Sequence, residues 1–155
     1  MLSNAEGRSP WGDQARWQAL RDGTACPICR NGPKDVVVSL SVSWVTAPPM
    51  APLPGYCCVM AKRHVVEPFE LPGDECSAFF SDAMGVARAL AEEFQPVKLN
   101  YEIHGNTIPH LHMHLFPRFV SDPFEGGPID PKRARFTRSQ SELRRLADAI
   151  RSHCL

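Results

Sequence analysis

The chain has 155 residues, of which 43% are hydrophobic, and this is enough for a single domain with a buried core. Lys plus Arg and Asp plus Glu number 17 each, so no global charge is available to hold a nucleic acid or an acidic membrane as a partner. No apolar run approaches the ~20 residues of a membrane span, and the first residues lack a signal-peptide core, which predicts a cytoplasmic protein.

The N-terminal half predicts one short helix followed by two strands. The helix is expected to begin at Ser9, ahead of a proline that suits the first helical position, and to stop near Gly23. Residues 38–44 alternate between apolar side chains and serine, which is the period of a half-buried strand. A proline-rich loop over residues 48–55 then leads to a second strand over residues 56–61.

The C-terminal half predicts two helices and a hairpin. Between residues 74 and 94, apolar side chains recur at intervals of three and four, as on one face of a helix. Two alternating segments, 97–103 and 110–116, flank a tight turn and predict antiparallel strands. Ser139 has capping-box spacing to Glu142 at the start of a last amphipathic helix. These elements indicate an α+β domain with a mainly antiparallel sheet of about five strands.

Three histidines alternate with apolar residues in the last predicted strand. Successive side chains point to opposite faces of a strand, so His110, His112 and His114 are expected on one face and the intervening apolar residues on the other. A single histidine here would more often be a structural residue. Three titratable rings side by side cost stability unless they are used, so this arrangement indicates a functional site.

The chemistry of imidazole favours attack on phosphorus. A neutral ring nitrogen is a competent nucleophile, and its partner N–H can be held by a backbone carbonyl. His112, the central residue, is best placed for this role. Its neighbours and the preceding turn can then donate hydrogen bonds to phosphate oxygens during an in-line displacement.

The pattern His-apolar-His-apolar-His-apolar-apolar resembles the signature of the histidine triad (HIT) superfamily of nucleotide hydrolases and transferases. The segment 53–64 also resembles the strand that leads to a proline-lysine-x-histidine corner in that family, and the likeness covers roughly residues 26–120. It implies a HIT-like fold over 1–155, with an N-terminal helical extension over 1–25 and a C-terminal loop and helix over 121–155.

The same resemblance implies an activity and a set of site residues. The expected enzyme is a hydrolase or nucleotidyl transferase that cleaves a dinucleoside polyphosphate or a nucleoside phosphoramidate through a nucleotidyl-histidine intermediate. It needs no organic cofactor, and family members usually form homodimers. The implied catalytic residues are His112, His114 and His110, and the implied substrate-binding residues are Asn100, Asn106 and Thr107.

Three positions depart from the pattern of relatives. Asn106 stands where several relatives have the longer glutamine, four residues before the triad. The strand corner reads Ala-Lys-Arg-His and lacks the usual proline. Pro109, directly before the triad, is most like a bacterial-type branch of the family.

Cys26 and Cys29 have the spacing of a zinc knuckle, and His64 and His110 could complete a tetrahedral site. A redox pair or two unrelated thiols are the alternatives, although a thioredoxin-like strand-to-helix context is missing. A subset of histidine-triad proteins places zinc on such a set, so the resemblance implies a structural Zn²⁺. Four protein ligands leave no open position for water activation. The six cysteines are expected to be reduced.

Other residues and other functions remain open at this stage. Residues 45–50 could line a nucleoside pocket. The basic residues Lys132, Arg133, Arg135 and Arg138 could meet a polyphosphate, but a solvated loop is the favoured interpretation. A non-catalytic nucleotide-binding protein is the main alternative function. A cupin-type oxygenase is less favoured, because no carboxylate and histidine at suitable spacing complete an iron site.

Overall fold

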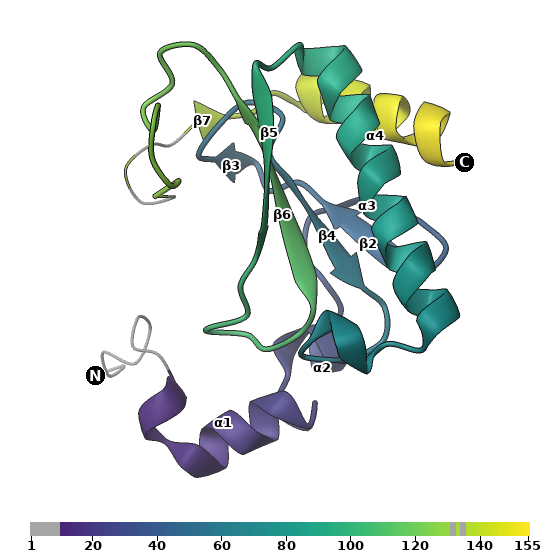
Figure 1. The fold of residues 1–155 in the computed structure, drawn as a ribbon, viewed down its shortest axis with the longest axis vertical. Helices are drawn as coiled ribbons and strands as arrows, with labels where there is room; N and C mark the ends of the chain where they lie inside the picture. The colour runs from purple at the N-terminus through teal and green to yellow at the C-terminus, as the bar shows by residue number, and fades with distance from the viewer. Residues whose placement is uncertain (1–9, 131–132, 134–135) are drawn as a thin grey trace.

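A five-stranded antiparallel sheet with two helices on one face forms the body of the protein. The structure is a computed structural model that describes residues 10–130, 133 and 136–155. The strand order is β1-β2-β4-β6-β5, and α3 and α4 lie together on one face (Figure 1). This confirms the α+β fold with five antiparallel strands. The strands of this sheet are β1 (Val36–Ser39), β2 (Ser43–Thr46), β4 (Cys57–Ala61), β5 (Lys98–Ile103) and β6 (His112–Arg118).

The N-terminal helix starts later than the sequence predicts. Ser9 lies outside the described residues, and a 3-10 turn, η1 (Pro10–Gly12), precedes α1 (Gln14–Arg21). Asp13 is the N-cap, because its carboxylate accepts a hydrogen bond from the backbone N–H of Arg16 at 3.0 Å. One further turn of helix, α2 (Pro27–Asn31), follows and was not predicted.

The single strand predicted over residues 38–44 is wrong, because the chain turns within it. Leu40 and Ser43 are joined across this turn by a backbone hydrogen bond of 2.8 Å, and β1 and β2 form a hairpin on either side. The carboxylate of Asp82, on α3, accepts hydrogen bonds from the hydroxyl of Ser43 at 2.6 Å and the N–H of Val42 at 3.3 Å. A residue 40 positions away therefore stabilises the turn.

The two long helices agree with the sequence prediction and build the core. After a 3-10 turn, η2 (Pro68–Glu70), α3 (Gly73–Phe94) buries its apolar side against the sheet, and α4 (Gln140–Cys154) crosses it. A Cβ at Gly85 would lie 2.7 Å from the Cys154 sulfur, so the missing side chain permits this close crossing. The predicted cap of α4 is confirmed, since the Ser139 hydroxyl accepts from the Glu142 N–H at 3.1 Å.

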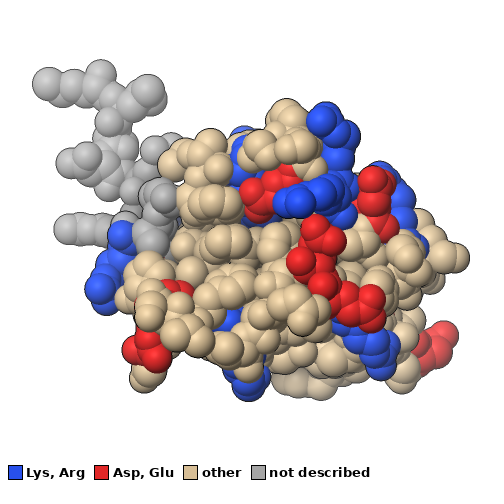
Figure 2. All heavy atoms as spheres, turned by 90° about the horizontal axis from the view of Figure 1, so that it is seen from above, with Lys and Arg blue, Asp and Glu red and all other residues tan. Residues whose placement is uncertain are grey.

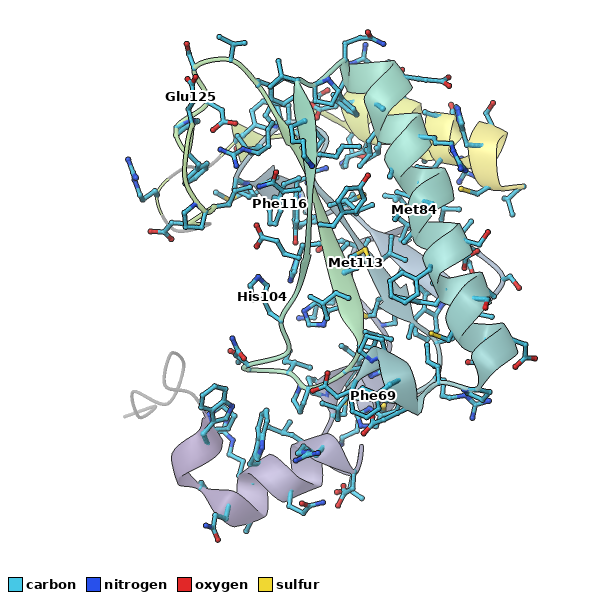
Figure 3. The ribbon with its side chains drawn as sticks, in the orientation of Figure 1. Phe69, Met84, His104, Met113, Phe116 and Glu125 are labelled. Carbon is cyan, nitrogen blue, oxygen red and sulfur yellow. The ribbon has the colours of Figure 1, made fainter. Side chains whose placement is uncertain are left out.

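The β5–β6 hairpin gives the sheet two chemically different faces. Met113 and Leu115 are buried in the core with α3, while His112 and His114 alternate with them and face the other side. Figure 3 shows His104 on the side of the hairpin away from α3. A small second sheet adjoins this side of the molecule and pairs β3 (Met50–Ala51) with β7 (Phe136–Thr137).

The surface agrees with the balanced composition. On the face shown in Figure 2, acidic and basic side chains are intermixed, and no broad field of one sign covers it. Among the described residues, no helix is both long enough and apolar enough to cross a membrane.

Candidate functional site

A cavity of about 470 Å³ lies on the face of the sheet that carries the histidines. Cys58, His112 and His114, from β4 and β6, line it together with residues 104–108 that connect β5 to β6. Thr46 and Pro48, from the segment expected to approach a nucleoside, also line it, as do Lys34 and Asp35 before β1. The cavity is of the size and mixed polarity that a nucleotide requires.

The ring of His112 is held with its nucleophilic nitrogen free. Its Nδ1 lies 2.6 Å from the backbone oxygen of His110. A carbonyl can only accept, so Nδ1 carries the proton and Nε2 of the neutral ring keeps its lone pair. Burial lowers the pKa of His112, and the hydrogen bond to His110 opposes this only in part. The ring is therefore neutral at pH 7.

His114 is held in the opposite way, by a donor. The Tyr56 hydroxyl lies 2.9 Å from Nδ1 of His114. Within the described residues, this nitrogen is the only hydrogen-bond partner of the hydroxyl. Burial raises the pKa of Tyr56, so the phenol keeps its proton. Burial, with His112 and His104 as smaller causes, lowers the pKa of His114 to about 4. Tyr56 therefore donates to Nδ1, and the proton of His114 is on Nε2.

His112 and His114 thus expose different chemistry to one cavity. Their ring centroids are 4.8 Å apart. One ring offers a lone pair on Nε2, and the other offers an N–H on Nε2. A phosphate beside them would meet a nucleophile and a hydrogen-bond donor together.

The predicted substrate-binding residues divide into two groups. Asn106 and Thr107 are exposed and line the cavity with His112. Asn100 pairs with Phe116 in the β5–β6 ladder and lines a separate hollow beside Arg118. The structure therefore does not bring Asn100 to the cavity. His104, just beyond the end of β5, lines it instead.

The four predicted metal ligands come together at the end of the same strand. Their ligand atoms all lie within 4.8 Å of one another: Cys26, Cys29, His64 and His110. The Sγ–Nδ1 separations are 3.6 Å for Cys26–His110, 3.3 Å for Cys29–His64 and 3.7 Å for Cys29–His110. Zinc bonds of roughly 2.0–2.3 Å in a tetrahedron place neighbouring ligand atoms about 3.3–3.8 Å apart. The group matches that size.

The hydrogen bonds of the two histidines also fit a cation between them. His110 Nε2 lies 2.7 Å from the backbone oxygen of Ala61, and His64 Nε2 lies 2.8 Å from that of Arg21. Both Nε2 atoms are therefore donors, and the two Nδ1 atoms face each other at 3.1 Å, where an imidazole without a proton on Nδ1 presents a lone pair. Facing lone pairs repel, and a bound metal ion would turn that repulsion into coordination.

The metal-ligand cluster, as we call Cys26, Cys29, His64 and His110, connects three parts of the chain. Arg21 is the last residue of α1, so the hydrogen bond from His64 fixes that helix to the strand corner. Cys26 directly precedes α2. His110 is a member of the cluster through its side chain, and its backbone oxygen holds the ring of His112. No disulfide joins any of the six cysteines in this structure.

Sequence reasoning missed Tyr56 and misjudged Arg138. Tyr56 gives no local signal, because its partner is 58 residues away. Arg138 was expected in a solvated loop, but it is 4% exposed and its guanidinium lies over the Tyr56 ring at 5.8 Å. Arg138 directly follows β7, and the pairing of β7 with β3 places Arg138 in the interior. Arg133 is exposed, whereas Lys132 and Arg135 lie outside the described residues.

The protein is thus an α+β domain in which two histidines of opposite tautomer line a cavity of nucleotide size. The model of the HIT domain matches residues 31–121, more than half of the chain. The chain therefore belongs to the HIT domain family.

Individual relatives agree with this assignment. Protein hit of Bacillus subtilis (strain 168) is 30% identical over 89 residues, which are 54% of this chain and 57% of that protein. The chain thus matches little more than half the length of that curated relative.

Solved structures support the fold. A histidine triad protein from Bradyrhizobium japonicum superposes with a TM-score of 0.70 at 24% identity, over 77% of this chain and 90% of that one. A Zn-bound histidine triad family protein from Mycobacterium smegmatis superposes with a TM-score of 0.64 at 19% identity, over 83% of this chain and 95% of that one.

Proposed function

We propose that this protein is a nucleotide-binding hydrolase or nucleotidyl transferase in which His112 is the nucleophile. The observation behind this proposal is the 2.6 Å hydrogen bond between His112 Nδ1 and the His110 backbone oxygen, which leaves the Nε2 lone pair free in the cavity. His114, the second catalytic residue, supplies an N–H beside it. Asn106 and Thr107 approach the phosphate from the loop.

The proposed reaction has two displacements at phosphorus. First, Nε2 of His112 forms a bond to phosphorus while the bond from phosphorus to the leaving group breaks, and the leaving group takes that electron pair. Then the oxygen of water, or of another acceptor, displaces His112. With water as acceptor, the nucleoside phosphate gains the water oxygen and one hydrogen, and the leaving group gains the other. The substrate is a nucleoside phosphoramidate or a dinucleoside polyphosphate.

The metal-ligand cluster has a structural role in this proposal. Cys26, Cys29, His64 and His110 bind Zn²⁺, which ties α1 to the sheet and holds the backbone on which His112 depends. Burial, with Cys26 second, raises the pKa of the Cys29 thiol to about 11, so zinc must displace its proton to bind. Thiolate ligands require a reducing compartment, for which we propose the cytoplasm. We propose that residues 1–155 form one HIT-like domain with its core over about 26–120.

A homodimer is the proposed assembly. Strand β5 ends the sheet order, so one of its edges has no partner strand within the described residues. Val97, Tyr101 and Ile103 on and beside it are 67%, 44% and 39% exposed. An exposed apolar edge of this kind is a ready surface for a second copy.

The test is turnover with trapping of the intermediate. Purified protein and its His112→Asn variant are incubated with adenosine phosphoramidate and with dinucleoside polyphosphates, and products are separated by chromatography. Native protein should release adenosine monophosphate and carry a transient phosphorus–nitrogen adduct on a peptide containing His112. His112→Asn should lose at least about 10³-fold in turnover and keep its nucleotide affinity.

His153→Asn is the matched control, because His153 lies on α4, where it contacts the Ala149 backbone oxygen and the Glu92 carboxylate, and is part of neither the cavity wall nor the metal-ligand cluster. This variant should turn over at the native rate. Nucleotide binding without product from any substrate would refute the catalytic proposal in favour of the non-catalytic binding protein. Stoichiometric iron with oxygen consumption would instead indicate the oxygenase.

A further inference from the structure

A hydrogen-bonded pair, His104 and Glu102, lies beside the histidines of β6. Nε2 of His104 is 2.9 Å from the Glu102 carboxylate. Glu102 is directly opposite His114 in the β5–β6 ladder, so the two side chains share the cavity face of the sheet. His104 lies on the side of the hairpin away from α3 (Figure 3) and lines the cavity, with its ring centroid 5.8 Å from that of His114. The pair thus adjoins the space in which a substrate would bind.

The proposed reaction needs a group that moves a proton twice. An amine must gain a proton as its bond to phosphorus breaks, and water must lose one as it attacks. His112 cannot serve, because its Nε2 bonds to phosphorus. Burial above all lowers the pKa of His114 to about 4, so this ring stays neutral and only donates a hydrogen bond. Burial raises the pKa of Tyr56 and of Cys58, so neither of these groups exchanges a proton near pH 7.

The hydrogen bond to Glu102 distinguishes His104 from the other titratable residues of the cavity wall, Lys34 and Asp35. An ionised carboxylate only accepts, so Nε2 of His104 keeps its proton in both charge states of the ring. Nδ1 is then the atom that gains and loses a proton, and no hydrogen bond occupies it in the part of the chain that the structure describes. An imidazole oriented by a carboxylate is an arrangement suited to general acid–base catalysis.

The surroundings of His104 suit a group that changes its charge. Its side chain is 51% exposed, so the ring can exchange protons with bulk water between turnovers. Burial is the main cause of the lowered pKa values of His112 and His114, and a positive charge on His104 lowers both further. A protonated His104 therefore helps to keep the lone pair on Nε2 of His112 free for attack.

We propose that His104, oriented by Glu102, is a further catalytic residue that protonates the leaving group and then takes a proton from the attacking water. In the first step the Nδ1–H bond of His104 breaks, and the leaving nitrogen or oxygen gains the proton as its bond to phosphorus breaks. In the second step a water O–H bond breaks and its proton returns to Nδ1. The water oxygen bonds to phosphorus while the bond to Nε2 of His112 breaks. This inference rests on the proposed function and adds its proton carrier.

The test compares two substrates that share adenosine 5′-phosphate and differ in their need for a proton. One is the phosphoramidate of methylamine, whose leaving group departs only when protonated. The other is the p-nitrophenyl ester, whose phenolate departs without a proton. His104→Gln should lower kcat/KM about 10²-fold or more for the phosphoramidate and less than about threefold for the ester. Because the ester is turned over by the same fold, it also shows that the variant is folded.

Two further variants support the comparison. Glu102→Ala should lower kcat/KM for the phosphoramidate about tenfold and spare the ester, since it removes only the group that orients His104. The matched control is His153→Gln, because Nε2 of His153 lies 3.1 Å from the Glu92 carboxylate in a similar pair that lines no part of the cavity. This control should leave both values unchanged.

The outcomes separate this inference from the proposed function. Turnover that His112→Asn abolishes, but that His104→Gln leaves unchanged or lowers equally for both substrates, would overturn the role of His104 alone. A loss confined to the phosphoramidate would support it. No turnover of either substrate by the native protein would overturn the proposed function together with this inference.

Discussion

His110 and His112 are two residues apart, and a backbone carbonyl holds each ring, yet the two sites differ in what they can bind. In His110 the carbonyl of Ala61 holds Nε2, and the free Nδ1 faces two sulfur atoms and a second imidazole. In His112 the carbonyl of His110 holds Nδ1, and the ring lines an open cavity. In our proposal, the same side chain is thus a metal ligand in one place and a nucleophile in the other.

The difference shows that the role of an imidazole depends on which nitrogen the backbone occupies and on what faces the other. Around His110, three more ligand side chains complete the four positions of a tetrahedral cation. Open surroundings leave room for a phosphate. His110 also links the two sites, because its backbone oxygen orients His112. A change in the metal site should therefore be felt in the cavity, whereas a change in the cavity should leave the metal in place.

The largest expected effect comes from removing the metal site. Cys26→Ser with Cys29→Ser should abolish stoichiometric zinc and lower the free energy of unfolding by about 3 kcal/mol or more, since metal binding is coupled to folding. Turnover should fall as well, because His110 loses its anchor. Elemental analysis, denaturant unfolding and kinetics on tag-free protein measure the three quantities.

The control for this double variant is Cys76→Ser with Cys154→Ser, which changes two free thiols outside the cluster. It should retain zinc. His112→Asn should also retain zinc, and loss of zinc from that variant would contradict the one-way coupling of the two sites. Absence of metal from the native protein, with no stability loss in the cluster variant, would refute the zinc site itself.

A pH effect is expected from the buried rings of the cavity. His114 has a pKa of about 4 in the fold against 6.5 as the ordinary value. Between these values the unfolded chain binds more protons, so the free energy of unfolding rises with pH, by up to about 3 kcal/mol over the window. His114→Asn should lack this pH-dependent contribution to the free energy of unfolding. Subtracting the variant's free energy of unfolding from that of the native protein at each pH removes any effect of zinc release. Urea unfolding from pH 4 to pH 7 measures it.

His153 gives the matched comparison with the opposite sign. The Ala149 backbone oxygen, with Glu92 second, raises the pKa of this exposed histidine. Its contribution to stability is present below the ordinary pKa and is lost as the pH rises through the raised one. His153→Asn should therefore change the pH slope in the reverse direction. Equal slopes for the two variants would contradict the neutral, buried state of His114.

A smaller effect is expected from the donor that fixes His114. Tyr56→Phe removes one hydrogen bond, worth about 1–2 kcal/mol, and should lower kcat about 5- to 30-fold. ¹⁵N spectra of the histidine rings should show the proton of His114 on Nε2 in the native protein and a mixture of tautomers in the variant. Tyr101→Phe, on the exposed edge strand, should change neither quantity. A native Nδ1–H tautomer for His114 would refute the role of Tyr56.

The sequence predicts this molecule well where the signal is local. Residues 74–94 have a helical period over six turns, and His110 to His114 have the period of a strand, so both features could be recognised. Of the predicted metal ligands, Cys26 and Cys29 were found because their spacing is typical of zinc sites, and His64 and His110 were added from the family resemblance.

The features that sequence reasoning missed depend on contacts between distant segments. The turn between β1 and β2 is stabilised by Asp82 of α3, and an alternating pattern continues through it. The two-residue strands β3 and β7 are too short to have a period. Arg138 gains its place when those strands pair, and Tyr56 reaches His114 when β4 pairs with β6.

The smallest expected effect separates two residues that the sequence assigned to the same role. Asn106 and Thr107 lie on the cavity wall, whereas Asn100 lies beside Arg118, outside it. Thr107→Ala should reduce kcat/KM by about fivefold, the size of one lost hydrogen bond of about 1 kcal/mol. Asn100→Ala should stay within about twofold of the native value. Measuring kcat/KM with one phosphoramidate at fixed pH compares the two variants. An effect of Asn100→Ala as large as that of Thr107→Ala would mean that the substrate extends beyond the cavity, along β5, to Asn100.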